Sequence, residues 1–281
     1  MKVAVTGATG FVGRHVVAAL QQRGRPPTVV LRPGSVIPPG VSDERVVRMD
    51  LAHPPDDAYQ RLGRPDVLIH LAWGGLPNYG ATHHLEQELP AQIVFLESLL
   101  GQGLRSLTVT GTCLEYGMQS GALSEDMATE PVTAYGTAKD ELRQHLEQLH
   151  RAAPFRFTWA RLFYLHGEGQ ARGALVPALE NAIAAGAESF DMSGGEQLRD
   201  YLPVEEAAGY LVALATNEKD NGIVNVCSGV TISIGELAQR VVAKHGASIT
   251  LNLGHYPYPV YEPMAFWGDR RKLDQTLGLD T

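Results

Sequence analysis

The chain contains few cysteines, fewer basic than acidic residues and no long hydrophobic run. Its two cysteines, Cys113 and Cys227, are too few and too far apart to form a disulfide framework or a metal site, so we expect reduced, buried thiols and no bound metal. Met1-Lys2 precedes an apolar stretch too short for a signal peptide, and no run of about 18 apolar residues occurs. These absences predict a cytoplasmic protein with no membrane partner. The formal net charge of −8 argues against a nucleic-acid partner, because phosphate backbones are bound by basic surfaces.

Apolar runs typical of strands alternate with helical patterns in the first part of the chain. With 281 residues, 44% of them hydrophobic, the chain can bury a substantial core in one large domain or two unequal ones. Expected strands cover residues 3–5, 28–31, 46–49, 67–71, 107–110 and 157–161, and expected helices cover residues 13–23, 85–100 and 135–152. This alternation predicts βαβ units, a parallel sheet and an α/β fold.

Beyond residue 167 the pattern becomes less regular. Helical patterns cover residues 175–187 and 204–216, a short strand is expected at 223–226, and a capped helix start between Thr231 and Gly235 leads to a helix ending near His245. This change in pattern predicts a second, smaller lobe.

A glycine-rich loop follows the first expected strand. Thr6-Gly-Ala-Thr-Gly-Phe-Val-Gly13 lies between that strand and a helix, which is the context of a dinucleotide-binding motif. Its glycines permit a tight turn and a close approach to a pyrophosphate at the helix N-terminus. The alternative is a tight strand-to-helix turn without a ligand. The binding interpretation predicts a Rossmann-type, doubly wound domain over residues 1–165, to which the chain returns around 195–228, with residues 166–281 forming mainly a substrate-binding lobe.

The residues after the second expected strand bear on the choice of cofactor. An acid that holds the adenosine ribose is expected about 20 residues beyond the glycine loop. Leu31-Arg32-Pro33-Gly34 stands there instead, and Arg14 directly follows Gly13. A guanidinium suits a 2′-phosphate, so NADP(H) is favoured and NAD(H) remains possible. Alternatively, Arg32 is a solvated loop charge and the protein accepts either cofactor.

Tyr135 and Lys139 form a phenol and amine pair one helical turn apart. Residues four apart on a helix share a face, so the Lys139 ammonium is expected to favour the phenolate of Tyr135 and lower its pKa. A phenol adjusted in this way can transfer a proton near neutral pH. The pair predicts an oxidoreductase, although Tyr-x-x-x-Lys alone is a weak pattern.

Five segments, occurring in order over almost the whole chain, carry a family resemblance. They are the glycine loop, His70-Leu-Ala-Trp73, Thr110-Gly-Thr-Cys-Leu-Glu-Tyr-Gly117, Tyr135 with Lys139, and Arg199-Asp-Tyr-Leu-Pro-Val204. Together they resemble the extended short-chain dehydrogenase/reductase family, the NAD(P)-dependent sugar epimerase/dehydratase group. Counting back five positions from Gly117, the resemblance implies that Thr112 is the catalytic hydroxyl. It further implies that Thr112 binds the substrate carbonyl, Tyr135 transfers the proton, and Lys139 binds the nicotinamide ribose.

The resemblance also implies the residues that bind the two ligands. Expected cofactor contacts are Gly7, Thr9, Gly10, Phe11, Val12, Gly13, Arg14, Arg32, Asp50, Leu51, Leu71, Ala72, Trp73, Thr110, Tyr135, Lys139 and Leu162. Expected substrate contacts are Trp73, Thr112, Cys113, Tyr135, Phe163, Tyr164 and Arg199. Arg199 would bind the diphosphate of a nucleotide sugar through its planar guanidinium. Arg199 could instead form a salt bridge to Asp200 or a neighbour, and the two aromatic residues could be core residues.

Three reactions known in the family can be compared on the residues after Thr112. Dehydratases carry an Asp-Glu pair there, whereas this chain has Cys113-Leu114, and Glu115 falls on the other side of an extended strand. Epimerisation on both sides of a ketone needs a second acid/base pair; Cys113 and His166 are candidates, but Cys113 lies one residue closer to Thr112 than that pattern requires. A simple reductase needs no second pair.

The segments after His70 and Thr110 look most similar to those of reductases acting on nucleotide-linked 4-keto-6-deoxyhexoses. We therefore expect hydride transfer to C4 of such a sugar, linked to dTDP or CDP. A 4-epimerase with bound NAD, and a non-catalytic NADP-sensing protein on the same fold, are the alternatives. The helices expected at 85–100 and 135–152 resemble those that pair in the family's homodimers, although an apolar stripe serves core packing equally well.

Overall fold

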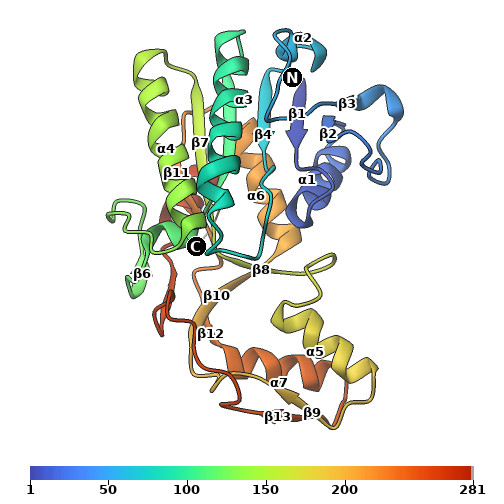
Figure 1. Cartoon of the computed structure of the whole chain (residues 1–281), viewed down its shortest axis with the longest axis vertical. Helices are drawn as coiled ribbons and strands as arrows, with labels where there is room; N and C mark the ends of the chain where they lie inside the picture. The colour runs from blue at the N-terminus through green and yellow to red at the C-terminus, as the bar shows by residue number, and fades with distance from the viewer. Residues whose placement is uncertain (280–281) are drawn as a thin grey trace.

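A seven-stranded parallel sheet forms the centre of the larger lobe (Figure 1). The computed structural model describes residues 1–279. The strands lie in the order β11, β7, β5, β4, β1, β2, β3, and all neighbours are parallel. Their bounds are β1 (Val3–Thr6), β2 (Thr28–Leu31), β3 (Val46–Arg48), β4 (Val67–His70), β5 (Ser106–Thr112), β7 (Arg156–Leu162) and β11 (Gly222–Val226). The order reverses between β1 and β4, where α/β sheets commonly bind ligands.

Helices cover both faces of this sheet. One face packs against α1 (Phe11–Gln22), α6 (Val204–Thr216) and α8 (Arg271–Leu277), and the other against α2 (Ala58–Arg61), α3 (Leu89–Gly101) and α4 (Ala134–Ala152). Neighbouring strand residues alternate between the two cores: Val3 and Val5 belong to the first and Ala4 to the second. The predicted doubly wound α/β fold is confirmed.

The smaller lobe has its own core, below the larger lobe in Figure 1. A three-stranded sheet joins β12 (Thr231–Ser233), β10 (Leu198–Pro203) and β8 (Tyr164–His166), and β13 (Thr250–Asn252) pairs with β9 (Ser189–Asp191). Helices α5 (Leu175–Ala184) and α7 (Ile234–Lys244) pack against each other. A last pair, β6 (Gly121–Leu123) and β14 (Phe266–Gly268), joins the C-terminal part of the chain to the loop after β5.

The segment before α3 differs from the expected continuous helix. Residues His84–Glu88 form a π-helical turn, η2, and α3 begins at Leu89 with Pro90 in its first turn. Proline has no N–H to continue the preceding turn, and it is tolerated at the first position of a helix. The capped helix start expected between Thr231 and Gly235 is confirmed: Thr231–Ser233 pairs with β10, and the Ser233 side chain then caps α7, which begins at Ile234.

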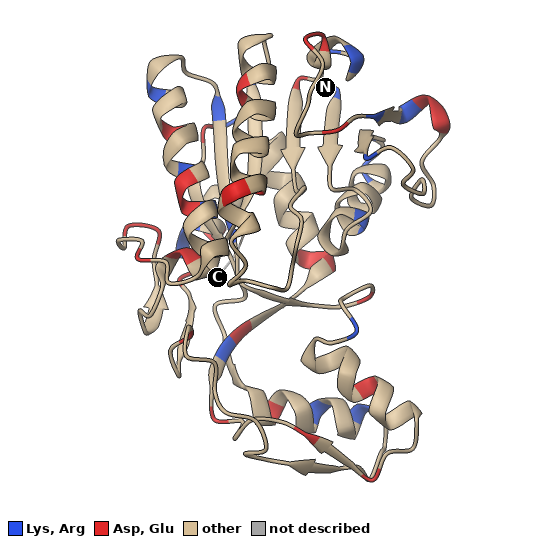
Figure 2. Cartoon of the chain, viewed as in Figure 1, with Lys and Arg blue, Asp and Glu red and all other residues tan. Residues whose placement is uncertain are grey.

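Within residues 1–279, no helix is both long enough and apolar enough to cross a bilayer. In the same part of the chain, His, Cys, Asp and Glu side chains form no group that could hold a metal ion. Figure 2 shows acidic and basic residues on both lobes, with both signs interspersed along α4 of the larger lobe and α7 of the smaller one.

Candidate active site

The glycine loop between β1 and α1 brings the backbone close to the end of β4. Gly7 has a φ of +70°, and a Cβ at this position would lie 2.8 Å from the backbone of Leu71 and Ala72. A Cβ at Gly13 would overlap the Gly7 carbonyl. Gly10 is the N-cap of α1, and in the described structure no side chain caps this end. The N–H groups of the first turn are therefore available to an anion such as a pyrophosphate, and the loop fits a dinucleotide.

The predicted cofactor residues lie in segments that meet at the carboxyl edge of the sheet. Gly7–Arg14 joins β1 to α1, Arg32 follows β2, Asp50 and Leu51 follow β3, and Leu71, Ala72 and Trp73 follow β4. Thr110 lies in β5, and Leu162 ends β7. Parallel strands end at the same edge, so the topology gathers these segments on one side.

Two predicted cofactor arginines follow neighbouring strands of this edge: Arg14 lies in α1, after β1, and Arg32 directly follows β2. The Arg32 side chain reaches Gly74, where a Cβ would lie 3.5 Å from its Nη2. The Arg14 Nε donates to the Gly10 carbonyl at 3.4 Å. The Arg14 and Arg32 guanidiniums are both exposed, so they are accessible to an anionic ligand. At Asp50, a third predicted cofactor residue, hydrogen bonds from the His53 ring and the Ala52 N–H lower the pKa of the carboxyl group.

The segment after β4 is held by a buried histidine. The Thr6 hydroxyl accepts from the N–H groups of Leu71 and Ala72 at 3.2 and 3.3 Å, so its own proton is directed to His70 Nδ1, 2.9 Å away. The His70 Nε2–H then donates to Gln92 Oε1 at 2.8 Å. Burial lowers the pKa of His70 to about 3, so the ring is neutral at physiological pH. His70 is therefore a structural support for the loop.

Thr112, Tyr135 and Lys139 converge at the end of β5. Thr112 ends this strand, and Tyr135 and Lys139 project from the first turns of α4. The Lys139 ammonium donates to the Thr110 carbonyl at 2.9 Å and lies 5.9 Å from the centre of the Tyr135 ring. The Thr112 hydroxyl is close enough to Tyr135 to favour its phenolate. All three side chains are buried.

Burial has opposite effects on the acidities of the two helical residues. It raises the pKa of Tyr135 above the ordinary phenol value, and it lowers the pKa of Lys139 from 10.5 to about 7. Both shifts favour the neutral forms, since a buried charge loses its hydration. This differs from the expectation that Lys139 would lower the pKa of Tyr135: burial is the largest cause of the shift, and Tyr79, Glu115 and Cys113 add to it.

Aromatic rings surround Tyr135: Trp73 was an expected ligand contact, whereas Tyr79 and His84 were not singled out from the sequence. The rings of Trp73, Tyr79 and His84 lie 5.9, 5.6 and 5.2 Å from it, centre to centre. The Tyr135 N–H donates to the Tyr79 carbonyl at 2.9 Å. The Trp73 indole N–H donates to His84 Nδ1 at 3.1 Å, and the His84 Nε2–H donates to the Asn78 carbonyl at 2.9 Å. The available signal was the dense run of aromatic and histidine residues between positions 70 and 84.

The predicted substrate residues Cys113 and Phe163 pack into a buried cluster. They contact Tyr116, Leu123, Cys227 and Phe266. Burial raises the pKa of the Cys113 thiol, which disfavours a role as a base. His166, its candidate partner in epimerisation, lies against the Tyr201 ring instead.

Arg199 is engaged with the C-terminal segment rather than with Asp200. Its guanidinium is 1% exposed and donates to Glu262 at 2.9 Å, and its centre lies 4.5 Å from the centre of the Phe266 ring. The Tyr164 hydroxyl bonds to the other Glu262 oxygen. Asp200 accepts from Ser228 and Gly229. Glu262 therefore occupies the donor face of the arginine that was expected to contact a diphosphate.

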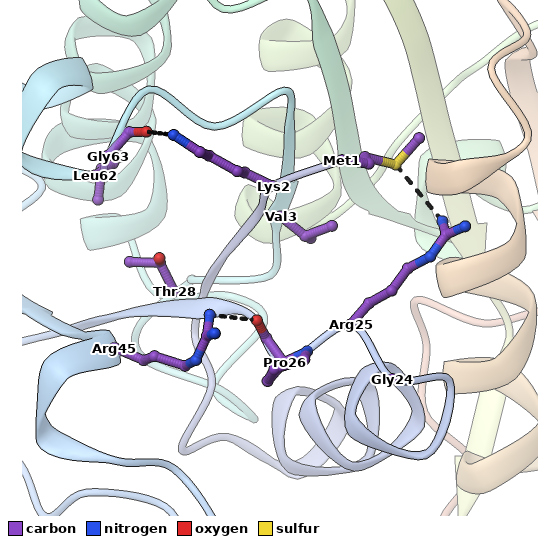
Figure 3. A pocket seen from close by; sticks show the side chains of 10 residues that line it. All are labelled: Met1, Lys2, Val3, Gly24, Arg25, Pro26, Thr28, Arg45, Leu62 and Gly63. Atoms are coloured by element: carbon purple, nitrogen blue, oxygen red, sulfur yellow. Dashed lines mark hydrogen bonds between the residues drawn. The ribbon is translucent and has the colours of Figure 1, made fainter.

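A separate pocket of about 600 Å³ lies at the amino ends of β1 and β2 (Figure 3). It is lined by Lys2, Arg25 and Arg45 together with Met1, Val3, Gly24, Pro26, Thr28, Leu62 and Gly63. Lys2 donates to the Gly63 carbonyl, and Arg45 donates to that of Pro26. These residues are at the opposite end of the sheet from the glycine loop, and none is a predicted site residue.

Comparison with known proteins identifies a family for this arrangement. A family model described as NAD dependent epimerase/dehydratase family matches residues 3–227. The chain is 26% identical to a dTDP-6-deoxy-L-talose 4-dehydrogenase (NAD(+)) of Aggregatibacter actinomycetemcomitans, over 95% of this chain and 99% of the relative. It is also 26% identical to a GDP-6-deoxy-D-talose 4-dehydrogenase of the same organism, over 100% and 92%.

More distant matches extend the comparison to other reactions. The chain is 24% identical to a UDP-glucose 4-epimerase of Corynebacterium glutamicum, over 99% of this chain and 90% of the relative. The solved structure of TunA, an NAD dependent-NDP-hexosamine 5,6-dehydratase, shares the fold, with a TM-score of 0.85 at 23% identity over 100% of this chain and 92% of that one. Since the family model covers the glycine loop and the Tyr135–Lys139 pair, the chain belongs to the NAD dependent epimerase/dehydratase family and is an oxidoreductase of the extended short-chain dehydrogenase/reductase type.

Proposed function

We propose that the protein reduces the 4-keto group of a nucleotide-linked 6-deoxyhexose, with dTDP or CDP as the favoured nucleotide. The observation that carries this proposal is the convergence of Thr112, Tyr135 and Lys139 beside the glycine loop. Two relatives named as 4-dehydrogenases of nucleotide-linked 6-deoxytaloses support it. Oxidation of a C4 hydroxyl and reduction of a C4 ketone are one reaction in opposite directions.

Each buried residue has a role in this reaction. The Tyr135 hydroxyl is un-ionised near neutral pH, so it holds the proton that the C4 oxygen receives. The Thr112 hydroxyl donates to the same oxygen and orients it. Lys139 supplies positive charge beside the phenol and binds the nicotinamide ribose. A bound nicotinamide dinucleotide would supply the hydride to C4.

The cofactor that we propose is NADP(H), with NAD(H) as a possible substitute. The support is Arg32, which is exposed directly after β2, where an acid would otherwise bind the ribose. The test compares dissociation constants for NADP⁺ and NAD⁺ in the wild type and in Arg32→Ala. A loss of affinity for NADP⁺ alone, of about tenfold for a lost charged contact, is expected. Equal affinities in the wild type would contradict the preference.

The reaction itself is tested by NADPH absorbance with a panel of dTDP-, CDP-, GDP- and UDP-linked 4-keto-6-deoxy sugars. At least one should be consumed with formation of the 4-hydroxy sugar. Tyr135→Phe should lower kcat by about 100- to 10,000-fold, as expected for loss of the proton donor, and should leave NADPH affinity nearly unchanged. Tyr79→Phe, which removes a neighbouring phenol, is the matched control and should keep most of the activity. Unchanged turnover in Tyr135→Phe would contradict the assignment.

A nucleotide-sugar 4-epimerase is the second candidate, favoured by the relative named UDP-glucose 4-epimerase. An epimerase returns the hydride to the sugar that it oxidised, so it needs no net supply of reduced cofactor. Interconversion of UDP-glucose and UDP-galactose by protein purified with bound NAD would support this candidate, whereas stoichiometric NADPH consumption would support the reductase.

We also propose a homodimer formed through α3 and α4. These helices lie side by side on one face of the sheet (Figure 1), and Val94 of α3 is 48% exposed. Light scattering of the wild type and of Val94→Glu tests this arrangement. A dimer that dissociates in the variant is expected, and a monomeric wild type would contradict the proposal.

A further inference from the structure

Glu115 lies at the centre of a buried hydrogen-bond cluster below Thr112. It belongs to a one-turn helix, η3 (Cys113–Tyr116), and is 0% exposed. Its Oε1 accepts from the Thr112 N–H at 2.8 Å and from Trp159 Nε1 at 3.0 Å, and its Oε2 accepts from Arg161 Nε at 2.7 Å. Burial raises the pKa of Glu115, and the Arg161 charge and the N–H donors oppose that shift, because every partner donates to the ionised carboxylate.

The strand next to Glu115 is shaped to admit this carboxylate. A Cβ at Gly111 would overlap Trp159 Nε1 and would lie 2.5 Å from Glu115 Oε1. Glycine at this position therefore allows the carboxylate and the indole to meet below the strand. The contact between the Glu115 carboxylate and the Trp159 indole therefore depends on the missing side chain at Gly111 as well as on complementary charge.

The cluster determines where the Thr112 hydroxyl points. Thr112 is the N-cap of η3: its Oγ1 accepts from the Leu114 N–H at 3.3 Å, while the Glu115 side chain accepts from the Thr112 N–H. This reciprocal capping box joins the N-cap of the turn to its third residue and so fixes the N-terminal end of the turn. The Thr112 oxygen accepts within the turn, and its proton remains available to the substrate oxygen.

We infer that Glu115 is a positioning residue for the proposed reaction: it fixes the Thr112 hydroxyl, and its negative charge stabilises the ammonium form of Lys139 against burial. This inference rests on the proposed function for the roles of Thr112 and Lys139. The positional part follows from the capping box. The electrostatic part follows from the geometry at the end of β5, because Lys139 donates to the Thr110 carbonyl and Glu115 accepts from the Thr112 N–H, two residues further along the strand.

The charged and titratable groups around Lys139 support the electrostatic part. Burial lowers the pKa of Lys139, and the carboxylates of Glu115, on η3, and Glu88, on η2, oppose that shift. His70 of β4 and His84 of η2 also face the ammonium, but their own pKa values are lowered, so they add no positive charge near neutral pH.

The Glu115 carboxylate raises the pKa of Tyr135, as it does the pKa of Lys139. The groups facing the phenol from other elements are Tyr79, Cys113, Glu115 and the Thr112 hydroxyl. Burial is the largest cause of the raised pKa of Tyr135. Tyr79, Glu115 and Cys113 raise this pKa further, and Thr112 lowers it. Removing the charge of Glu115 should therefore lower the pKa of both Lys139 and Tyr135.

NMR titration of Lys139 tests the electrostatic part without substrate or cofactor. The chain has five lysines, so [¹³Cε]-lysine labelling gives a spectrum in which Lys139→Met identifies the resonance. The wild-type resonance should titrate near 7. In Glu115→Gln the midpoint should fall by about one unit, a tenfold change in the ammonium–amine equilibrium. An unchanged midpoint would overturn the inference.

Asp140→Asn provides the matched control. Asp140 is the residue after Lys139 and is also buried in an ion pair, but its carboxylate bonds to Arg143 at 2.7 Å. This variant should lose stability while the Lys139 midpoint stays at its wild-type value. An equal shift in Asp140→Asn would mean that the shift reports loosened packing, which would overturn the inference.

Activity measurements test the positional part. In Glu115→Gln, kcat for the reduction should fall about 10- to 100-fold through misplacement of Thr112, and the high-pH limb of the kcat profile should move to lower pH. Glu115→Asp keeps the charge but shortens the reach, so kcat should fall while the Lys139 midpoint stays near 7. A wild-type kcat in Glu115→Asp would overturn the inference. If Glu115→Gln does not fold, the kcat of Glu115→Asp is the measurement that decides the inference. If no sugar of the panel is reduced, the proposed function is wrong. The NMR titration needs no substrate, so it still tests the effect of Glu115 on Lys139.

Discussion

The Lys139 ammonium lies 4.0 Å from the centre of the Trp73 ring, over the face of the indole. A cation over an aromatic face in a desolvated site is stabilised by about 2 kcal/mol. Trp73 therefore supports the charge that burial disfavours. It also connects Lys139 to His84, which accepts its indole N–H.

Replacing Trp73 should weaken the cofactor site through Lys139. In Trp73→Leu the dissociation constant for the dinucleotide should rise by about tenfold, in line with the loss of a buried cation–π contact. Trp73→Phe keeps an aromatic face and should show a smaller rise. Fluorescence-quench titration measures both, and wild-type affinity in the leucine variant would show that the contact has no role in binding.

Gly13→Ala should abolish dinucleotide binding because the added methyl overlaps the Gly7 carbonyl. The loop would have to shift away from the position in which it approaches the pyrophosphate, and we expect affinity to fall by about 100-fold or more. Gly209→Ala in α6 is the control: its new methyl meets nothing within 4 Å, and the helix should gain up to about 1 kcal/mol. Calorimetric titration and thermal unfolding separate the two effects.

Lys139 should make stability depend on pH in a defined window. Its pKa is about 7 in the folded protein and 10.5 when exposed, so between these values the unfolded chain binds more protons and stability rises with pH. Lys139→Met removes this dependence. The unfolding free energy of the variant should be higher than that of the wild type. The difference should be largest at pH 7 and below, and it should shrink as pH rises towards 10.5. Urea unfolding at pH 6.5, 8 and 9.5 measures it; a difference that is constant with pH would contradict the buried-ammonium account.

Glu262→Gln should increase affinity for a nucleotide sugar if Arg199 binds the diphosphate. Glu262 holds Arg199 at 2.9 Å and would repel an incoming diphosphate, so loss of its charge should lower KM several-fold with kcat nearly unchanged. Tyr164→Phe removes the other partner of Glu262 without changing its charge and is the control. A raised KM in Glu262→Gln would show that this carboxylate contributes to binding, and would contradict the competition.

The sheet and most helices could be predicted from local patterns. Parallel strands covered on both faces appear as continuous apolar runs, and helix Val204–Thr216 was expected with the bounds that it has. The glycine loop and the Tyr135–Lys139 pair were recognisable because their chemistry lies within a few neighbouring residues.

The contacts that escaped prediction join residues far apart in sequence. Glu115 meets Trp159 and Arg161 across 44 and 46 positions, and Arg199 meets Glu262 across 63. The direction of the Tyr135 and Lys139 pKa shifts depends on burial by Trp73, Tyr79 and His84, which spacing alone does not reveal. The π-helical turn before α3 has no periodicity of its own to detect.

The order in which strands join the sheet limits how this molecule can be cut or recombined. β11 completes the sheet beside β7 only after the chain has left for β8, α5 and β10 and come back through α6. A fragment ending near residue 165 would leave β7 as an open edge and offer its backbone to other chains, a known route to aggregation. Chimeras that exchange the lower lobe must therefore splice two separate insertions at once, one on either side of α6 and β11.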